Sequence, residues 1–310
     1  MKSVVKRFLA IFGIRSKYDS ERHKKYTFLK KKLESSSESD KKGTSIIIFS
    51  KDRAMQLESL MQSYFWHVKN PVPVHVIYQA SFQKYQKAYD QVMELFTEQD
   101  VSFIKEQDFK SDLTIVINTL ECSKILFLVD DLVFKEQVDF NEFTNINPKE
   151  YVASLRLGDH LNYAYTLDEN QPLPSLVKSN KHPGMVTWSW HKGYGDWAYP
   201  LSVDGNLFDK NELKLLISSL DFKAPNSFEE SLQIMHEFYA LKKGICYSNS
   251  IIVNNPCNKV QNENDNTFGE ISIDDLNEKW LEGFRIDFNV YDGIRNISAH
   301  QELPIKFVKR

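Results

Sequence analysis

The sequence predicts an α/β fold in which buried parallel strands alternate with helices. The run Ile125–Val129 has five consecutive apolar residues without alternation, a pattern typical of a strand covered on both faces. Before this run, strand-like and helix-like segments follow one another in regular order. Such an order favours a largely parallel sheet with right-handed crossovers, because each parallel strand needs a long connection back to the same edge.

Hydrophobic periodicity places the individual elements. The apolar residues Leu57, Leu60, Met61 and Tyr64, for example, recur at helical spacing. A later helix is expected to start within 222–232, where Pro225 precedes a capping residue, Asn226 or Ser227. The expected strands are 45–50, 74–78, 101–104, 125–129 and 151–158, and the expected helices are 56–64, 85–96 and 112–120, the last capped by Asp112.

Charge divides the chain into three regions. The net charge is −3, yet residues 1–42 hold 13 Lys and Arg against 5 Asp and Glu. We expect a basic amphipathic helix region at 1–34, a flexible linker at 35–43 and a folded domain at 44–310. An acidic body with its basic residues gathered in one arm argues against a nucleic-acid partner.

The segment Val4–Arg15 combines apolar residues at helical spacing with basic neighbours. It either makes peripheral contact with an anionic membrane or docks on the folded domain, and the sequence supports both readings equally. No stretch is apolar enough to span a bilayer, and three cysteines without short spacing suit a reducing compartment. The expected location is cytoplasmic, at or near the inner face of the cell membrane.

Two acids, Asp130 and Asp131, directly follow the buried run. Buried carboxylates need a partner, and open α/β sheets bind ligands where their strands end. Hard oxygen ligands suit Mg²⁺ or Mn²⁺, which usually bring a substrate phosphate with them. The alternative is that the pair only caps a turn or a helix.

The first predicted strand ends in Ser50, Lys51, Asp52 and Arg53, which should emerge at the same edge. Polar and cationic groups at the first strand-to-helix turn favour a nucleotide. The chain has neither a G-x-G-x-x-G nor a G-x-x-x-x-G-K motif, so a dinucleotide dehydrogenase or a P-loop NTPase is not expected.

Three of the five tryptophans, Trp188, Trp190 and Trp197, fall within ten residues and are interleaved with polar residues and glycine. This mixture predicts a surface on which sugar rings stack. The alternative is a hairpin that buries the rings in the core.

Further acids and a histidine are candidates for catalysis. Glu229 and Glu230 follow the predicted helix start, where an acid either acts as a base or only complements the helix dipole. A base in that position would tend to have a lowered pKa, a tendency that partial burial and nearby sugar hydroxyls could offset. His300 either serves as a third metal or phosphate ligand or is a structural hydrogen bonder.

The chain resembles the GT-A nucleotide-sugar glycosyltransferases, whose Rossmann-like α/β fold has a mixed sheet flanked by helices. The residues that carry this resemblance are the strand and turn at 46–53, Asp130 and Asp131, which look like a variant of the D-x-D motif, and the acid-bearing helix start. The chain is also similar to bacterial surface-polysaccharide glycosyltransferases with Trp-x-Tyr-Pro-x-Ser-x-Asp-Gly, Pro-Asn-x-x-Glu and Asn-Pro-x-Asn-x-Val-Gln segments, matched at 197–205, 225–229 and 255–261.

The resemblance implies an enzyme that moves a sugar from a nucleotide-sugar donor to a glycan or lipid-linked acceptor. It implies Mn²⁺ or Mg²⁺ at Asp130 and Asp131, to which His300 is the candidate third ligand. If the enzyme inverts at the anomeric carbon, it implies a base at Glu229, with Asp204 and Glu230 as substitutes. Groups that bind the donor or the acceptor complete the implied site: Ser50, Lys51, Arg53 and Asp130 on the nucleotide, and Arg156, Trp188, Trp190 and Trp197 on the sugars.

Two other classes remain open. A sugar-phosphate nucleotidyltransferase would share the sheet and the metal, although it usually carries a glycine-rich basic loop that residues 50–56 lack. A non-catalytic sugar-binding or scaffold protein would explain the aromatic segment without nucleotide affinity. Nucleotide binding therefore discriminates between the classes.

Overall fold

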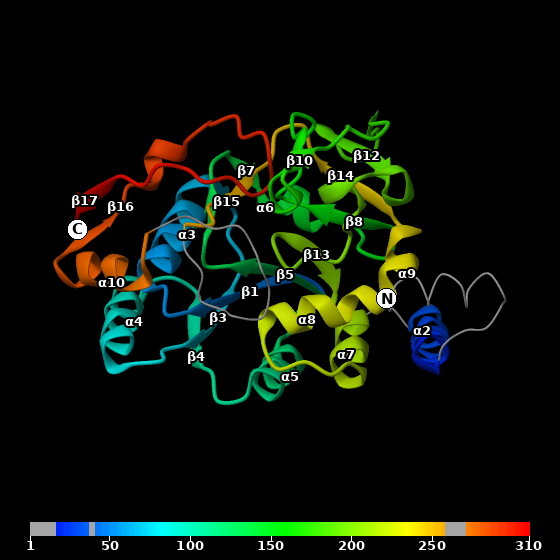
Figure 1. Ribbon diagram of the computed structural model, residues 1–310, viewed down its shortest axis with the longest axis horizontal. Helices are drawn as coiled ribbons and strands as arrows, with labels where there is room; N and C mark the ends of the chain where they lie inside the picture. The colour runs from blue at the N-terminus through cyan, green and yellow to red at the C-terminus, as the bar shows by residue number, and fades with distance from the viewer. Residues whose placement is uncertain (1–16, 37–40, 258–270) are drawn as a thin grey trace, which may run out of the picture.

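The computed structural model describes residues 17–36, 41–257 and 271–310 and forms an α/β architecture with a nine-stranded mixed sheet flanked by helices (Figure 1). This confirms the predicted fold class. The strand order is β11-β12-β14-β8-β13-β5-β1-β3-β4. These strands are β1 Thr44–Lys51, β3 Val74–Gln79, β4 Val101–Lys105, β5 Lys124–Val129, β8 Tyr151–Ser154, β11 Val177–Lys178, β12 Met185–Ser189, β13 Asn206–Asp209 and β14 Lys243–Tyr247.

The helices lie on both faces of this sheet, and the remaining strands of the described residues form four separate two-stranded sheets. The helices are α2 Lys17–Glu34, α3 Ala54–His67, α4 Gln83–Leu95, α5 Phe109–Thr119, α6 Phe140–Thr144, α7 Lys210–Ser219, α8 Pro225–Leu232, α9 His236–Ala240 and α10 Ile273–Leu281. The short strands are β2 Val68–Lys69, β6 Leu132–Phe134, β7 Val138–Asp139, β9 Tyr163–Ala164, β10 Glu169–Asn170, β15 Ile252–Asn254, β16 Phe284–Ile286 and β17 Phe307–Lys309.

The parallel half of the sheet matches the sequence prediction closely. Strands β5, β1, β3 and β4 are parallel neighbours, and helices α3, α4 and α5 connect them. One cap was predicted wrongly: Asp108, not Asp112, accepts the backbone N–H of Ser111 at the start of α5. Asp112 instead accepts the backbone N–H groups of Gln107 and Asp108.

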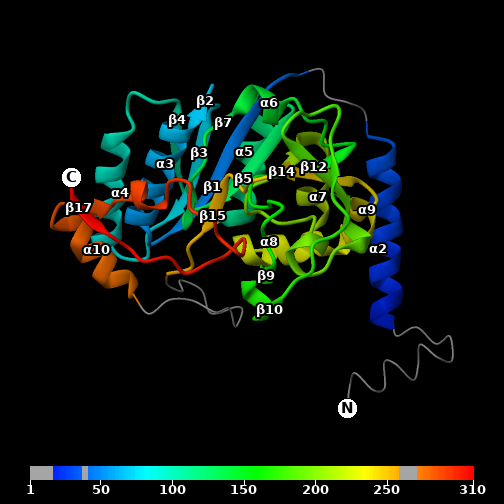
Figure 2. The same ribbon diagram turned by 90° about the horizontal axis from the view of Figure 1, so that it is seen from above.

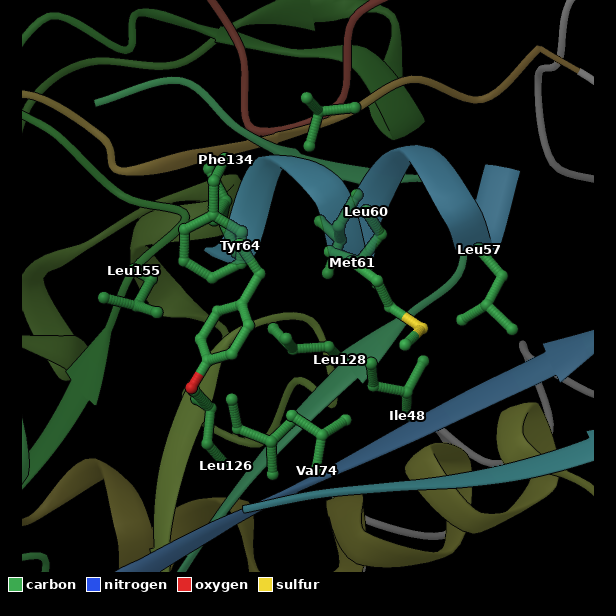
Figure 3. Packing of buried hydrophobic residues seen from close by; sticks show 14 of the residues in the cluster. Ile48, Leu57, Leu60, Met61, Tyr64, Val74, Leu126, Leu128, Phe134 and Leu155 are labelled. Carbon is green, nitrogen blue, oxygen red and sulfur yellow. The ribbon is translucent and has the colours of Figure 1, made fainter. Parts of the chain in front are cut away.

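The core consists of two apolar layers, one on each face of the sheet. Successive residues of β1 alternate between them, because side chains of a strand point to opposite faces: Ile46 and Ile48 join one layer, Ile47 and Phe49 the other. Figure 3 shows the first layer, in which Leu57, Leu60, Met61 and Tyr64 of α3 pack on Ile48, Leu126 and Leu128. Helices α4 and α10 also cover this layer, whereas α5, α7 and α8 cover the other.

Helix α2 packs against the body at one end of the molecule (Figure 2). Leu29 and Leu33 are buried in the second core layer, and Lys149 donates hydrogen bonds to Ser36. Residues 17–34 are therefore packed on the body, although the sequence suggested a separate arm. The predicted helix at 4–15 and residues 37–40 of the predicted linker lie outside the described residues.

Candidate functional site

Strands β1 and β5 end side by side, so the residues that follow them share one edge of the sheet. Phe49 is paired in register with Val129. Ser50 directly follows Phe49, and Asp130 directly follows Val129. The structure thus brings the predicted turn 50–53 next to the predicted acid pair, as parallel pairing requires.

Arg53 holds both acids of the pair together. Its Nη1 lies 3.0 Å from Oδ1 of Asp130 and 2.9 Å from Oδ2 of Asp131, and all three side chains are buried or nearly so. The pKa of Asp130 is raised to about 6, because burial and the neighbouring Asp131 raise it by more than the charge and hydrogen bond of Arg53 lower it. The pair is therefore a tightly coupled group of two acids and one cation.

The arrangement of these acids does not fit a divalent cation while Arg53 stays in place. The remaining oxygens are also engaged, since Oδ2 of Asp130 accepts the backbone N–H of Lys51 at 3.1 Å and Oδ1 of Asp131 accepts the amide of Asn254 at 2.8 Å. Among the described residues, no three His, Cys, Asp or Glu side chains are grouped so as to hold a metal. The crevice beside the acids has a volume of about 10 Å³, the space of roughly one water molecule.

The two other residues predicted to bind the nucleotide differ in their exposure. Ser50 is buried, and its hydroxyl lies 2.6 Å from the hydroxyl of Tyr89, so it is engaged inside the protein. The side chain of Lys51 is exposed at the same edge. Of these two side chains, that of Lys51 offers a charged group to solvent.

A second cluster of acids is built around the loop before β13 and the start of α8. Glu229 is half-buried, and its Oε2 accepts the backbone N–H of Val203 at 2.9 Å. Asp204 follows Val203 and precedes Gly205, whose φ of +79° lies in the left-handed region that favours glycine. A Cβ at Gly205 would also lie 2.4 Å from Ile252, so this turn requires glycine to hold Asp204 in place.

The electrostatics of this cluster favour a proton acceptor. Burial raises the pKa of Glu229 to about 7, and the neighbouring charge of Asp204 adds to the rise. The N–H of Val203, the hydroxyl of Tyr199 and the charge of Arg156 lower it by smaller amounts. Desolvation and a second carboxylate therefore outweigh the lowering of the pKa expected at a helix start.

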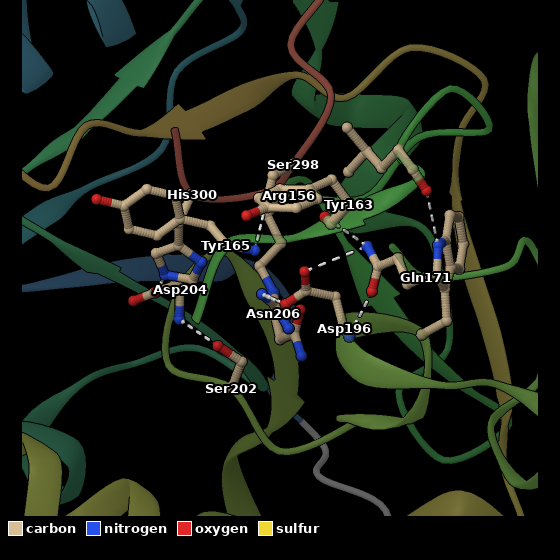
Figure 4. A network of polar contacts seen from close by, with 12 residues as sticks. Arg156, Tyr163, Tyr165, Gln171, Asp196, Ser202, Asp204, Asn206, Ser298 and His300 are labelled. Carbon is tan, nitrogen blue, oxygen red and sulfur yellow. Dashed lines mark hydrogen bonds and ion pairs between the residues drawn. The ribbon is translucent and has the colours of Figure 1, made fainter. Parts of the chain in front are cut away.

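Arg156 follows the end of β8 by two residues, and Figure 4 shows it beside Asp196. Its Nη1 donates to Asp196 at 2.8 Å, and Asp196 is held in turn by Gln171. Its Nε and Nη2, together with Oδ1 of Asn206, are buried without a hydrogen-bond partner among the described residues. Unsatisfied buried groups of this kind are costly, so they mark a place where a polar ligand or water is accommodated.

Two predicted site residues are placed differently from expectation. His300 does not join Asp130 and Asp131: its Nε2 lies 3.0 Å from Oδ2 of Asp204. Burial lowers the pKa of His300, but the hydrogen bond and charge of Asp204 outweigh this and raise it. Glu230 is exposed on α8, one position away from the cluster, because neighbouring residues of a helix face different directions.

The cap of α8 was also predicted wrongly. Ala224, not Asn226 or Ser227, is the N-cap residue, and Pro225 is the first helical residue. Ser227 lies inside the first turn, where its hydroxyl accepts the backbone N–H of Ala224 at 3.0 Å. Glu229 consequently lies in the second turn.

The three clustered tryptophans do not form a sugar-stacking surface. Trp188, Trp190 and Trp197 are at most 3% exposed, and the ring of Trp188 packs at 4.7 Å from Trp190 and 4.9 Å from Trp197, between centroids. Gly244 is needed beneath Trp188, since a Cβ there would lie 2.2 Å from the ring. The alternative of core packing is correct, and a stacking role for these rings is excluded.

Replacing Trp197 by Ala should therefore lower the free energy of unfolding by about 3–5 kcal/mol, the usual cost of removing a large buried ring. Urea denaturation followed by circular dichroism would measure this. Tyr194→Ala is the matched control, because Tyr194 is 44% exposed in the same segment and should cost about 0.5 kcal/mol. Equal effects of the two changes would contradict the assignment of Trp197 to the core.

Three residues of the site were missed in the sequence. Asn254 holds Asp131, Asp196 holds Arg156, and Tyr199 forms a hydrogen bond with Glu229. Asp196 immediately precedes, and Tyr199 lies inside, the segment 197–205 that carried the family resemblance. The tryptophan of that segment is buried in the core, whereas its polar neighbours Asp196 and Tyr199 contact Arg156 and Glu229.

Comparisons with known proteins bear on the family. No family model matches the chain. A curated protein from Dictyostelium discoideum, the bifunctional glycosyltransferase pgtA, is 26% identical over 272 residues, which cover 76% of this chain and 35% of that protein. The chain thus corresponds to about a third of the length of this relative. The predicted resemblance to glycosyltransferases is confirmed at the level of sequence similarity.

Solved structures were also compared. A WbbM bifunctional glycosyltransferase in its apo form aligns with a TM-score of 0.36 and 11% identity, covering 65% of this chain and 38% of that one. A mannosyltransferase from Pyrobaculum calidifontis, in complex with GDP-Man and Mn²⁺, aligns with a TM-score of 0.30 and 13% identity, covering 48% of this chain and 45% of that one.

Proposed function

We propose that this relative of glycosyltransferases transfers a sugar from a nucleotide-sugar donor to a hydroxyl of a glycan or lipid-linked acceptor on a GT-A fold. The observation that carries the proposal is Glu229, a carboxylate whose pKa is held at about 7 by burial and by Asp204. A general base works best when its pKa lies near the working pH. Such a tuned carboxylate beside a partly exposed surface suits the deprotonation of a sugar hydroxyl.

In the proposed reaction, the acceptor oxygen attacks the anomeric carbon and gives its proton to Glu229. The bond from that carbon to the diphosphate oxygen breaks, and the nucleoside diphosphate leaves with the bonding pair. A single displacement of this kind inverts the anomeric centre. Lys51, whose side chain is exposed at the edge of the sheet, would offset charge on the leaving diphosphate.

Dependence on Mn²⁺ or Mg²⁺ is a separate proposal. A donor-bound cation at Asp130 and Asp131 would require Arg53 to release both carboxylates. With Arg53 in place, the guanidinium itself balances the acids, and nucleotide binding would not need the metal. We derive no step through a metal, and titration with and without Mn²⁺ separates the two arrangements.

An assay of donor turnover tests the function. The full chain would be incubated with UDP-, GDP-, CMP- and dTDP-sugars, with and without nitrophenyl glycosides and trisaccharides as acceptors, and nucleotide release measured. We expect one donor class to be turned over, faster when an acceptor is present. No release from any donor would count against the proposal and in favour of a non-catalytic sugar-binding protein. The sequence argument for a sugar-binding protein relied on an exposed aromatic surface, but the three tryptophans are buried.

The pH dependence of this reaction follows from Glu229. Because the base must be ionised, kcat/KM should rise with pH through a midpoint of about 7. Asp204→Asn removes a negative neighbour that raises the pKa of Glu229, so the midpoint should move to lower pH. Initial rates measured from about pH 5 to about pH 9 would cover both sides of this midpoint. A midpoint unchanged by Asp204→Asn would contradict the coupling of the two acids.

We also propose peripheral contact with an anionic membrane, in the assembly of a surface polysaccharide. Lys24, Phe28, Lys31 and Lys32 are exposed on α2, while its other side packs on the body. No helix among the described residues is long and apolar enough to cross a membrane. The chain should co-sediment with phosphatidylserine vesicles at low salt and not with phosphatidylcholine vesicles, since each basic residue near an anionic surface contributes about 1 kcal/mol. Equal sedimentation with both would contradict this proposal.

A further inference from the structure

A cleft of about 730 Å³ lies between α2 and the segment formed by the 3₁₀ helix Gln233–Met235 and α9. Such a volume is typical of sites that bind ligands of several sugar units or of drug size. Its lining combines aromatic rings with polar and charged groups: Arg22, His23 and Tyr26 from α2, and Tyr199, Gln233, Ile234, His236 and Glu237 from the body.

The sequence of α2 explains why the cleft lies beside the first turns of this helix and not beside its last turns. Arg22, Tyr26, Leu29 and Leu33 follow helical spacing and face the body together. Leu29 and Leu33 are buried in the core, so the later turns of the helix pack tightly. On the same face, Tyr26 lies one turn before Leu29 and Arg22 lies two turns before it. At these two residues the cleft separates the helix from the body.

Two residues that line the cleft, Tyr199 and Gln233, also contact the proposed base, Glu229. The hydroxyl of Tyr199 accepts a hydrogen bond from Nε2 of Gln233 at 3.0 Å and also forms a hydrogen bond with Glu229. Gln233 further donates to the backbone carbonyls of Leu201 and Glu229, at 3.3 and 3.0 Å. A ligand in contact with Tyr199 and Gln233 is thus one side chain away from the carboxylate of Glu229.

We infer that this cleft binds the acceptor, an oligosaccharide whose reactive end reaches Glu229 past Tyr199; the inference rests on the proposed function. The chemistry of the lining suits a glycan. The part-buried Tyr26 and Tyr199 supply aromatic rings in the lining on which sugar rings would stack, and the surrounding polar side chains offer partners for hydroxyls. These tyrosines, not the buried tryptophans, are the aromatic residues available on the acceptor side.

The inference gives α2 a role in specificity. The acceptor would be held between two parts of the chain that are far apart in the sequence, with residues 22–26 on one side and 199–237 on the other. Changes on α2 should therefore alter the use of the acceptor without altering the use of the donor.

Tyr26→Ala tests this with Phe28→Ala as its control. Phe28 is an aromatic residue of the same helix that is 54% exposed and does not line the cleft. Two rates are compared in the full chain: transfer to the acceptor found in the donor-turnover assay, and hydrolysis of the donor in water alone. We expect Tyr26→Ala to raise the KM for the acceptor about threefold to tenfold, as loss of an aromatic contact of 0.5–1.5 kcal/mol implies, and to leave donor hydrolysis unchanged.

The outcomes separate the cleft from the function. An acceptor KM that is the same in Tyr26→Ala, Phe28→Ala and the unchanged chain overturns the acceptor cleft while leaving the transferase in place. Loss of donor hydrolysis together with transfer in Tyr26→Ala also overturns it, because the change then acts through the fold or the donor. Failure of the unchanged chain to turn over any donor overturns the proposed function itself. Arg22→Gln, which alters an exposed side chain, should raise the acceptor KM without changing the unfolding midpoint.

Discussion

Glu229→Gln should abolish most of the sugar transfer while leaving the fold intact. Gln keeps the shape of the side chain and an oxygen that accepts the N–H of Val203, but it cannot take a proton from the acceptor. Loss of a general base typically lowers the rate by about 10²- to 10⁴-fold. The measurement is kcat in the donor-turnover assay with saturating acceptor, together with the unfolding midpoint of both proteins.

The control for this change is the adjacent acid. Glu230→Gln alters an exposed residue of the same helix, so it should keep kcat within about twofold of the unchanged chain. If the two substitutions lowered kcat equally, the proton acceptor would have to be another group, and Asp204 would be the first to examine. If Glu229→Gln kept full activity, the reaction would not use a base at this position.

Arg53→Ala should have the largest effect on stability. It leaves Asp130 and Asp131 adjacent and largely buried without their cation, and removal of one partner from a buried ion pair costs about 3–5 kcal/mol. The free energy of unfolding from urea denaturation would show this loss. Lys51→Ala, two residues away and exposed, should change it by no more than about 0.5 kcal/mol.

The same variant tests the relation between Arg53 and a metal. Removing the guanidinium frees one oxygen of each acid, so Mn²⁺ should raise the unfolding midpoint of Arg53→Ala more than that of the unchanged chain. A similar rise in both proteins would show that Mn²⁺ competes with Arg53 for the acids. A stability loss no larger than that of Lys51→Ala would contradict the description of a coupled buried group.

The parallel half of the sheet was predictable because its elements are long and locally regular. Residues 125–129 and 46–49 are short continuous apolar runs, a pattern that favours buried strands, and α3 and α4 carry clear helical spacing. Their carboxyl ends had to meet, which is why Asp130, Asp131 and Arg53 were expected at one edge. The pattern could not show that Arg53 would form ion pairs with both acids.

The second half depends on contacts that are distant in the sequence. Strand β13 has only four residues and lies antiparallel between β5 and β8, a position set by its neighbours and not by its own pattern. Trp188 and Trp197 look like surface aromatics because polar residues surround them, yet each indole N–H finds a buried backbone carbonyl, of Trp197 and Leu161 respectively. Likewise, His300 meets Asp204 only because the C-terminal segment passes beside β15 at Asn254.

Calorimetric titration of the full chain with UDP, GDP, CMP and dTDP, with and without Mn²⁺, tests the central claim most directly. The full chain is the right material because α2 packs on the body. The account predicts that one nucleotide binds and that Lys51→Ala, which removes an exposed cation from this edge of the sheet, weakens the binding. Binding that needs Mn²⁺ would indicate that the cation displaces Arg53, whereas binding without it would leave Arg53 in place. Failure of all four nucleotides to bind would contradict a donor site and, with it, the proposed transferase.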